Sequence, residues 1–301
     1  MSRSNPLTLL IDLSSIDPVR PDAAGEYALQ LTGALVRLAA HADVVVLEPG
    51  YRGRHPAAEV LLLPAGGRPR PGYRCFTAIH DLPHLAGGFA GFAHRFRAAF
   101  ATSRSEKVIA PSEFAAAAIE TRLRVPRRDI AVILPGLEPD FGRSSRDEAA
   151  AVRAEFGLPE RYLLSFGDEA SAEAAWAGAS RPAEGAGLVH HGQLGAEGNR
   201  LPALLSGAVG VILRGASGNP IRALQAMACG SPPIVGGDGS FPEVVRDAGL
   251  TVSPDRPGDW SEAISALYRS RPLRAQLSSR ARELAGSFSS ERAARSVLGL
   301  I

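Results

Sequence analysis

The sequence predicts an α/β protein of two domains, each with a parallel sheet that helices cover on both faces. Short apolar runs of strand length alternate with longer segments of helical spacing along the whole chain. Such alternation is typical of parallel sheets whose crossover helices bury both faces. The length of 301 residues suits two domains, since a domain commonly has about 150 residues. A hydrophobic content of 45% is enough to fill two cores.

In the first half, apolar runs predict six strands, and the segments between them predict helices. The strands are expected at residues 9–13, 44–47, 60–63, 77–82, 107–110 and 130–134. Helices are expected at 28–40 and 92–102, and a third begins at Glu113, where Ser112 is suited to cap the N-terminus. The side chains available for the buried side of the first helix are Leu29, Leu31, Leu35, Val36 and Leu38.

The second half repeats this pattern after a polar linker at residues 142–160, within which an alanine-rich helix begins. Strands are expected at residues 162–166, 188–192, 210–213 and 233–235, and helices at 201–205, 221–229 and 272–300. The pattern predicts three parts: an N-terminal domain at 1–145, a C-terminal domain at 146–285 and a last helix at 286–301.

Residues 218–230 are the most informative segment of the chain. A Gly-Asn-Pro turn opens an amphipathic helix, with Pro220 suited to its first turn. Gly230 ends the helix, and a short apolar strand follows. Because the turn comes after the strand at 210–213, the free amides and dipole of the helix N-terminus favour phosphate there. Ordinary packing of a helix against a sheet explains the same pattern equally well.

The order of residues after this turn is more specific. The chain reads Ala226-Met227-Ala228-Cys229-Gly230-Ser231-Pro232-Pro233-Ile234-Val235, then Phe241-Pro242-Glu243-Val244-Val245 and Asp247-Ala248-Gly249-Leu250. This series resembles the nucleotide-sugar site of the family 4 retaining glycosyltransferases, which have the GT-B fold. In the first half, Ile79-His80-Asp81-Leu82 and Ala110-Pro111-Ser112-Glu113-Phe114 are also similar to the family. The resemblance covers residues 9–141 and 160–292.

The resemblance implies two Rossmann-like domains whose parallel sheets face a cleft. The N-terminal domain would hold the acceptor and the C-terminal domain the donor, and the last helix would cross back to the first domain. Only about 25 residues separate Gly167 from Gly192. A helix, a strand and a second helix need more than about 30 residues. We therefore expect the C-terminal domain to be reduced by roughly one strand–helix unit.

The resemblance also implies the donor-site residues. Two family glutamates map to Ser217 and Gln225, so both carboxylates are replaced. In the family, the first glutamate contacts the transferred sugar and the second holds the ribose. The donor-binding residues implied are Arg214, Gly218, Asn219, Pro220, Ile221, Arg222 and Gln225.

The positive charge that holds the donor diphosphate in the family is missing from its usual place. An arginine should follow Gly167, but residues 168–173 form an acidic run instead. Carboxylates there would repel a pyrophosphate. Arg214 and Arg222 can replace the missing charge, because guanidinium suits phosphate well. Each could equally be a solvated surface arginine.

Three further residues have two interpretations each. His80 matches a family histidine near the transferred sugar, which makes it a candidate catalytic residue; alternatively, it is a turn histidine capped by Asp81. Gly25 matches a residue of the family's acceptor-side loop; alternatively, a glycine is needed there only for the local backbone conformation. Glu243 lies in the family series, but a carboxylate at a helix N-terminus explains it as well.

Composition excludes other classes of function. The net charge is +2, and no basic stripe with interleaved aromatics indicates a nucleic-acid partner. We expect no transmembrane segment, since no apolar run is long enough. Cys75 and Cys229 give neither a disulfide framework nor a metal-ligand spacing, and Cys229 suits helix packing. We expect no metal cofactor, and a cytoplasmic protein that is either free or peripheral to the membrane.

Three hypotheses of function remain open. The first is a divergent glycosyltransferase that transfers a sugar from a nucleotide-sugar to a carbohydrate or lipid-linked acceptor in glycan or polysaccharide biosynthesis. The second is an inactive homologue that acts as a scaffold for an active enzyme, through a protein partner or a homo-oligomer. The third is a module that binds a nucleotide or sugar without transfer.

Overall fold

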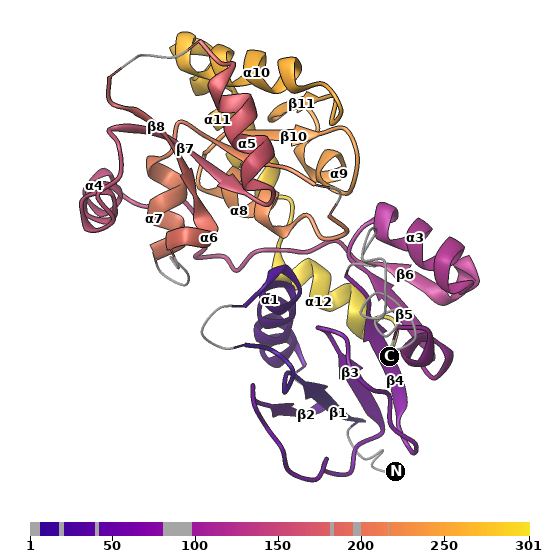
Figure 1. Cartoon of the computed structure of the whole chain (residues 1–301). Coiled ribbons are helices and arrows are strands. Elements are labelled where there is room, and N and C mark those ends of the chain that lie inside the picture. Colours follow the sequence, from indigo (N-terminus) through magenta and orange to yellow (C-terminus); the bar gives the residue numbers. More distant parts are fainter. Residues whose placement is uncertain are drawn as a thin grey trace. The chain divides into compact units, whose positions relative to one another are not determined.

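The computed structural model describes residues 7–17, 21–39, 42–80, 98–180, 184–194, 200–215 and 217–301. The chain forms two compact units (Figure 1). Unit 1 comprises Met1–Glu138 and Ser289–Ile301, and unit 2 comprises Pro139–Phe288. Each unit has one sheet of parallel strands, so the predicted α/β class is confirmed.

Within the described residues, the sheet of unit 1 has six strands in the order β2-β1-β3-β4-β5-β6, and every neighbouring pair is parallel. The strands are β1 (Leu7–Asp12), β2 (Ala42–Leu47), β3 (Val60–Leu63), β4 (Arg74–Ala78), β5 (Lys107–Ala110) and β6 (Ile130–Val132). All four residues of β3 are buried, as expected for a central strand covered on both faces. The fourth strand lies earlier than the 77–82 expected, so His80 follows β4.

Helix α1 (Ala23–Leu38) begins five residues before the predicted start at residue 28. Asp22 caps it, because its carboxylate accepts a hydrogen bond from the Gly25 amide at 2.8 Å. Of the side chains expected on the buried side, Leu31 and Leu35 are buried. Leu29 and Val36 were expected in the core, but they are 37% and 52% exposed. The aromatic side chain of Tyr27 and the small side chain of Ala28 are buried instead.

The other helices of unit 1 follow the sequence more closely. Ser112 caps α3 (Glu113–Leu123), as predicted, by accepting from the Ala115 amide at 3.0 Å. A 3-10 turn, η1 (Arg127–Asp129), precedes β6. Residues 98–103 are helical, while the first part of the helix expected at 92–102 lies outside the described residues.

In the part of unit 2 that the structure describes, the sheet has five parallel strands in the order β11-β10-β9-β7-β8. They are β7 (Arg161–Phe166), β8 (Ala186–His190), β9 (Gly210–Leu213), β10 (Pro233–Gly236) and β11 (Leu250–Val252). The helices are α4 (Arg146–Glu155), α5 (Glu169–Ala177), α6 (His191–Leu194), α7 (Arg200–Gly207), α8 (Ile221–Ala228), α9 (Phe241–Val245), α10 (Pro257–Arg269) and α11 (Arg271–Ala285).

Helices α5 and α10 of unit 2 were not predicted from the sequence. Helix α5 packs on α10, and Trp260 of α10 is only 1% exposed within the core. The short segment after β7 therefore folds as one helix and one strand, α5 and β8. That the domain is reduced relative to the family stays a prediction.

The first residues after unit 1 already pack on unit 2. The carbonyl of Gly142 accepts from the Cys229 thiol at 3.3 Å, and the Ser144 amide donates to Ser206 Oγ at 3.0 Å. These contacts lie before the boundary expected at 145/146. Burial raises the pKa of the Cys229 thiol to about 12, so this cysteine is neutral at physiological pH.

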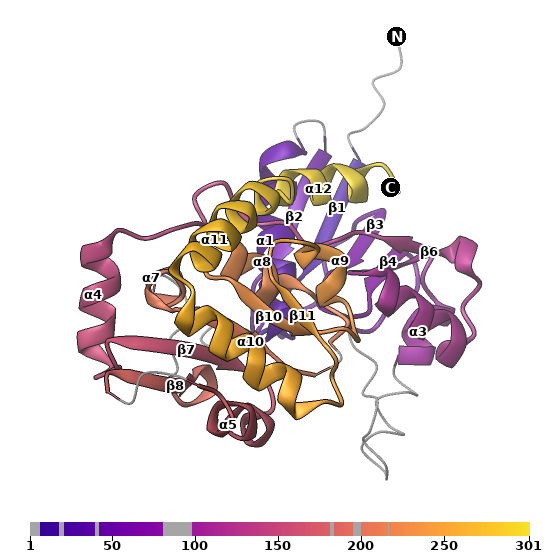
Figure 2. The ribbon, with the colours of Figure 1, turned by 90° about the horizontal axis from the view of Figure 1, so that it is seen from above.

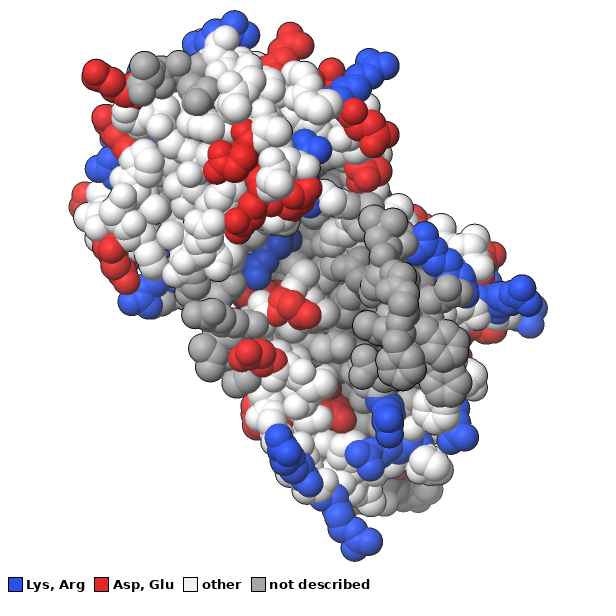
Figure 3. Space-filling model, viewed as in Figure 1, with Lys and Arg blue, Asp and Glu red and all other residues white. Residues whose placement is uncertain are grey.

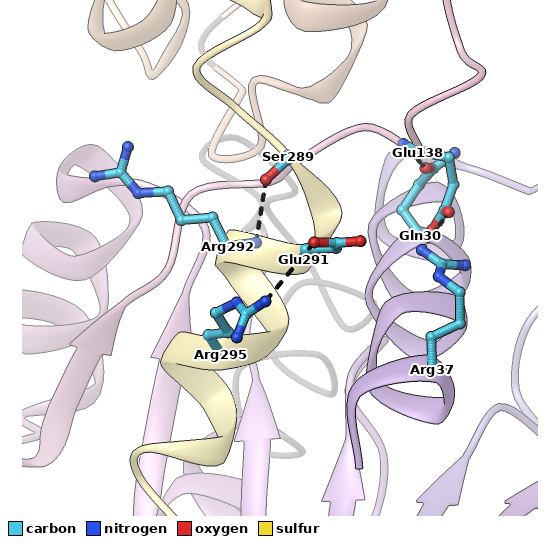
Figure 4. A network of polar contacts seen from close by, with 7 residues as sticks. All are labelled: Gln30, Arg37, Glu138, Ser289, Glu291, Arg292 and Arg295. Atoms are coloured by element: carbon cyan, nitrogen blue, oxygen red, sulfur yellow. Dashed lines mark hydrogen bonds and ion pairs between the residues drawn. The ribbon is translucent and has the colours of Figure 1, made fainter. Parts of the chain in front are cut away.

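The last helix, α12 (Ser290–Leu298), packs on α1 of unit 1, and Figures 1 and 2 both show the two side by side. The chain at the start of α12 requires a glycine at position 136, because a Cβ there would lie 2.1 Å from the carbonyl carbon of Ser289. The Ser290 amide donates to the Leu137 carbonyl at 2.9 Å. In Figure 4, Ser289 caps α12, while Arg37 of α1 forms an ion pair with Glu138.

Candidate functional site

In unit 2, the carboxyl ends of three strands and the start of α8 bring the predicted donor residues to one edge of the sheet. Phe166 ends β7, His190 ends β8, and Arg214 follows β9. The neighbours β7 and β9 end together: Gly167 has φ of +99°, and a Cβ there would lie 2.5 Å from the Arg214 carbonyl. Ligands of open α/β sheets bind at this edge.

The turn before α8 is held by its own polar groups. Asn219 is buried, and its Oδ1 accepts from the Ile221 amide at 3.1 Å. The Asn219 amide donates to Ser217 Oγ at 3.2 Å. Pro220 takes the N-cap position with φ of −85°, one residue before the first turn where it was expected. The side chain of Asn219 thus takes over a capping role that proline has no side-chain group to fill.

Gln225, which replaces the second family glutamate, is fully buried in α8. Its Oε1 accepts a hydrogen bond from Arg222 Nη1 at 3.0 Å. The guanidinium of Arg222 lies 5.6 Å from the ring centroid of Phe166. His191 stacks on Phe166 as well, at 4.4 Å and 27° between the planes. Arg222 is therefore a half-buried side chain with defined contacts, in contrast to a solvated arginine.

Arg214 is held differently. Its guanidinium lies 4.2 Å from the ring centroid of Trp260, and Nη2 donates to the Pro254 carbonyl at 3.4 Å. Among the residues that the structure describes, its buried Nη1 has no hydrogen-bond partner. Burial lowers the pKa of Arg214, while the charges of Asp168 and Asp238 raise it. A positive charge is thus available at this edge, next to two carboxylates.

The acidic run after β7 is engaged locally. The side chain of Asp168 caps α5 by accepting from the Ser171 amide at 3.3 Å. Hydrogen bonds from Ser171 lower the pKa of Asp168, and the charge of Arg214 adds to this. Glu173 pairs with His190 at 2.9 Å. The described part of the chain contains no group of three His, Cys, Asp or Glu that could hold a metal ion.

His80 of unit 1 is buried, 6% exposed, after β4. Its Nε2 donates to the Pro64 carbonyl at 2.7 Å, and its ring meets Tyr27 edge-on with centroids 4.8 Å apart. Burial lowers the pKa of His80 to about 4, so the ring is neutral at physiological pH. The alternative partner, Asp81, lies outside the described residues.

Gly25, the predicted acceptor-side residue, lies in the first turn of α1. It lines a hollow of about 210 Å³ together with Asp22 and Ser15. A Cβ at this position would lie 3.0 Å from both Ile16 Cγ2 and Pro21 Cβ. Close packing of the backbone thus accounts for the glycine, while its place in the hollow keeps it available to a ligand.

The sequence did not reveal the aromatic platforms under the two arginines. Phe166 was visible only as the end of an apolar strand, and Trp260 lies about 45 residues after Arg214 in a segment with no assigned element. Residues at the carboxyl ends of adjacent strands could have indicated Phe166. No sequence signal indicates Trp260.

A protein-family model matches a segment that includes the start of α8. Residues 182–284 match the family model described as "Glycosyl transferases group 1". A D-inositol 3-phosphate glycosyltransferase of Actinosynnema mirum is 38% identical over 78 residues, which make up 25% of this chain and 19% of that relative. The match therefore spans about a fifth of the length of that relative.

Three solved structures share the fold over nearly the whole chain. HepE of Anabaena, in complex with UDP and glucose, has a TM-score of 0.72 at 13% identity and covers 98% of this chain and 99% of its own. WaaG, a glycosyltransferase involved in lipopolysaccharide biosynthesis, has a TM-score of 0.72 at 13% identity, with 97% and 99% covered. Sucrose-phosphate synthase of Thermosynechococcus elongatus has a TM-score of 0.69 at 15% identity, and the match covers 98% of each chain. The chain has the GT-B fold, as predicted. No described helix is long and apolar enough to cross a membrane.

Proposed function

We propose that this chain is a divergent retaining glycosyltransferase of family 4, which transfers a sugar from a nucleotide-sugar to a carbohydrate or lipid-linked acceptor in glycan biosynthesis. Support comes from the family match over residues 182–284, which includes the whole turn before α8. Further support comes from a structure of the same fold, that of HepE in complex with UDP and glucose. The observation that carries the proposal is Arg222, held over Phe166 in the first turn of α8.

In this proposal the donor binds at the carboxyl edge of the unit 2 sheet. Arg222 and Arg214 neutralise the diphosphate, and the backbone at Gly218 and Asn219 approaches it at the start of α8. Gln225 fixes the guanidinium of Arg222 through the bond to its Oε1 and accepts from a ribose hydroxyl in place of a carboxylate. Ser217 faces the transferred sugar with a neutral hydroxyl.

On the acceptor side, His80 is the candidate catalytic residue and Gly25 the loop residue. Because Nε2 of the neutral ring donates to the Pro64 carbonyl, Nδ1 is the acceptor nitrogen, and it suits a hydrogen bond from a sugar hydroxyl. The depressed pKa of His80 keeps it neutral across the physiological range. Its Nε2 bond to Pro64 fixes the ring orientation.

A second candidate is the inactive homologue, and the donor motif itself favours it. Neither family carboxylate remains: Gln225 is buried and bonded to Arg222, and Ser217 bonds the backbone of Asn219. The carboxylates of Asp168 and Asp238 lie near Arg214 and oppose an incoming diphosphate. An inactive protein would act through a partner and would not bind the donor.

Calorimetry with UDP, GDP, UDP-sugars and GDP-sugars tests the proposal. We expect micromolar binding of one nucleotide and at least a tenfold loss in Arg222→Ala, since a charge-assisted bond contributes about 1.5–3 kcal/mol. The matched control is Arg200→Ala, an exposed arginine of unit 2 that pairs with Glu155. No binding at millimolar nucleotide, or equal losses in both variants, would contradict the donor site and favour the inactive homologue.

Product analysis separates transfer from binding alone. With the bound donor and a panel of sugar and lipid-linked acceptors, a retaining enzyme gives a product with the anomeric configuration of the donor. In an active protein, Ser217→Glu combined with Gln225→Glu is expected to raise turnover. Binding without any product in either form would identify a module that binds nucleotide without transfer.

A further inference from the structure

The sheet of unit 1 carries a hollow of about 1060 Å³ at its carboxyl edge, and three arginines lie in its lining. Arg68 and Arg70 come from the connection between β3 and β4, and Arg104 follows the helical residues 98–103. We infer that this hollow binds an anionic group, a phosphate or carboxylate, carried by the acceptor. The inference rests on the proposed function, because it names the chemical class of the acceptor.

The three arginines differ in their partners from Arg74 and Arg127, two other exposed arginines of the unit. Arg74 pairs with Glu106 at 2.8 Å, and Arg127 pairs with Glu113 at 2.9 Å. Among the described residues, by contrast, no carboxylate lies within ion-pair distance of Arg68, Arg70 or Arg104. Three like charges around one hollow raise its positive potential and attract an anion.

One carboxylate also lines the hollow, and its position is explained by α1. Asp22 Oδ1 accepts from the Gly25 amide at 2.8 Å, so this carboxylate is engaged as the helix N-cap. The positive end of the α1 dipole offsets part of its charge. Among the described residues, the lining therefore carries a net positive charge, with three guanidinium groups against one carboxylate.

The arginines are also partly ordered before any ligand binds. Arg68 and Arg70 each precede a proline in the run Arg68-Pro69-Arg70-Pro71, and a residue before proline is confined to extended backbone. The guanidinium of Arg104 lies 4.7 Å from the ring centroid of Phe100. Such constraints lower the entropy lost on binding. The planar fork of guanidinium matches the oxygens of phosphate and carboxylate.

An apolar wall lies beside the arginines. Phe100 is 37% exposed, and Ile79 and Ala101 also line the hollow. Figure 3 shows several basic side chains gathered on the visible face of unit 1. An aromatic ring next to guanidinium groups suits a ligand with both an anionic group and an apolar face, such as a sugar phosphate or a phospholipid headgroup.

Binding of simple anionic probes to the full chain tests the inference. Calorimetry would compare glucose 6-phosphate with glucose, and sedimentation would compare phosphatidylglycerol vesicles with phosphatidylcholine vesicles. The variant combines Arg68→Gln, Arg70→Gln and Arg104→Gln; the control is Arg127→Gln, whose arginine is exposed but paired. Circular dichroism and thermal unfolding establish that both variants fold.

We expect an anionic probe to bind, its neutral counterpart not to bind, and the triple variant to lose at least about tenfold in affinity. Binding of the sugar phosphate indicates a small phosphorylated acceptor, and binding of the anionic vesicles alone indicates a lipid-borne one. No binding of either probe, equal binding by the triple variant, or an equal loss in Arg127→Gln overturns the inference.

UDP binding measured on the same samples separates this inference from the proposed function. The triple variant is expected to bind UDP as the unmodified chain does, because its changes lie in unit 1. If the unmodified chain binds UDP but neither anionic probe, the inference fails while the proposed function stands. If it binds a probe but no nucleotide, the proposed donor site fails, and with it the assignment of the hollow to an acceptor.

Discussion

The two units place arginines at the carboxyl edges of their sheets, but they hold them in opposite ways. In unit 2, Arg214 and Arg222 are half-buried, lie on aromatic rings and have hydrogen-bond partners inside the protein. In unit 1, Arg68 and Arg70 are exposed and have no carboxylate partner among the described residues. The first pair is fixed in position, and the second is open to a ligand.

The difference shows two ways in which a protein can present an arginine to an anion: half-buried with fixed partners, or exposed to solvent. A buried guanidinium loses solvation, so the protein must supply partners, and at Arg214 the partners include the field of two carboxylates. Those carboxylates weaken the attraction for a diphosphate. An exposed guanidinium keeps its solvation and its full charge, but it loses more side-chain entropy when it binds. The arginines of unit 2 are therefore better fixed in position, whereas those of unit 1 keep more of their positive charge for a ligand.

The aromatic platforms give the largest expected effect. Trp260→Ala should lower the free energy of unfolding by about 3–5 kcal/mol, because Trp260 lies in the core of unit 2 at 1% exposure. Phe100→Ala should cost below about 1 kcal/mol, because Phe100 is 37% exposed. Denaturant unfolding of the two variants measures both. Equal losses would remove the contrast between a platform inside the core and one at the surface.

The buried histidine of unit 1 gives the next effect. The pKa of His80 is about 4 in the folded chain and 6.5 in the unfolded chain. Between these values the unfolded state binds more protons, so stability falls as the pH is lowered from 6.5 towards 4. The loss due to His80 amounts to about 3 kcal/mol at the lower end. Unfolding measured across this range should show a weaker pH dependence in His80→Gln, and an unchanged dependence would contradict the burial.

The sequence predicted those features of the fold that depend on local patterns of residues. Strands such as β3 and β9 were predicted within a residue, because apolar runs and turn residues are local patterns. Helix α1 was predicted to begin at residue 28, but the cap at Asp22 begins it at Ala23. Of its expected core residues, Leu31 and Leu35 are buried, whereas Leu29 and Val36 are exposed. Helix α5 was missed because its alanine-rich face has little apolar contrast, although Asp168 gave a cap signal.

At the candidate donor site, the sequence predicted the backbone elements but not all of the side-chain contacts. The turn at 217–222 and the start of α8 follow from Pro220 and the helical spacing after it. The pairing of Arg222 with Gln225 fits their spacing of three residues on one helix. The contact of Arg214 with Trp260 joins residues from two different elements, and only the folded sheet brings them together.

Removing a carboxylate near Arg214 should give a smaller effect that sharpens the comparison. Asp168→Asn keeps a side chain that can cap α5 but removes a negative charge from the edge. We expect UDP to bind about two- to threefold more tightly, since an exposed charge contributes below about 1 kcal/mol. Uridine, which has no phosphate, should bind unchanged in calorimetry. An equal gain for uridine would mean that the change acts on the fold and not on the charge.

The smallest expected effect is a difference in salt dependence between the two edges. Salt screens exposed charges over about 8–10 Å at physiological ionic strength, and it screens buried charges less. Raising the salt concentration should therefore weaken glucose 6-phosphate binding at Arg68 and Arg70 more than UDP binding at Arg222. Calorimetry of both probes in the same salt series measures the two slopes. A steeper slope for UDP would mean that Arg222 meets its ligand in open solvent, and the contrast between the two edges would then be wrong.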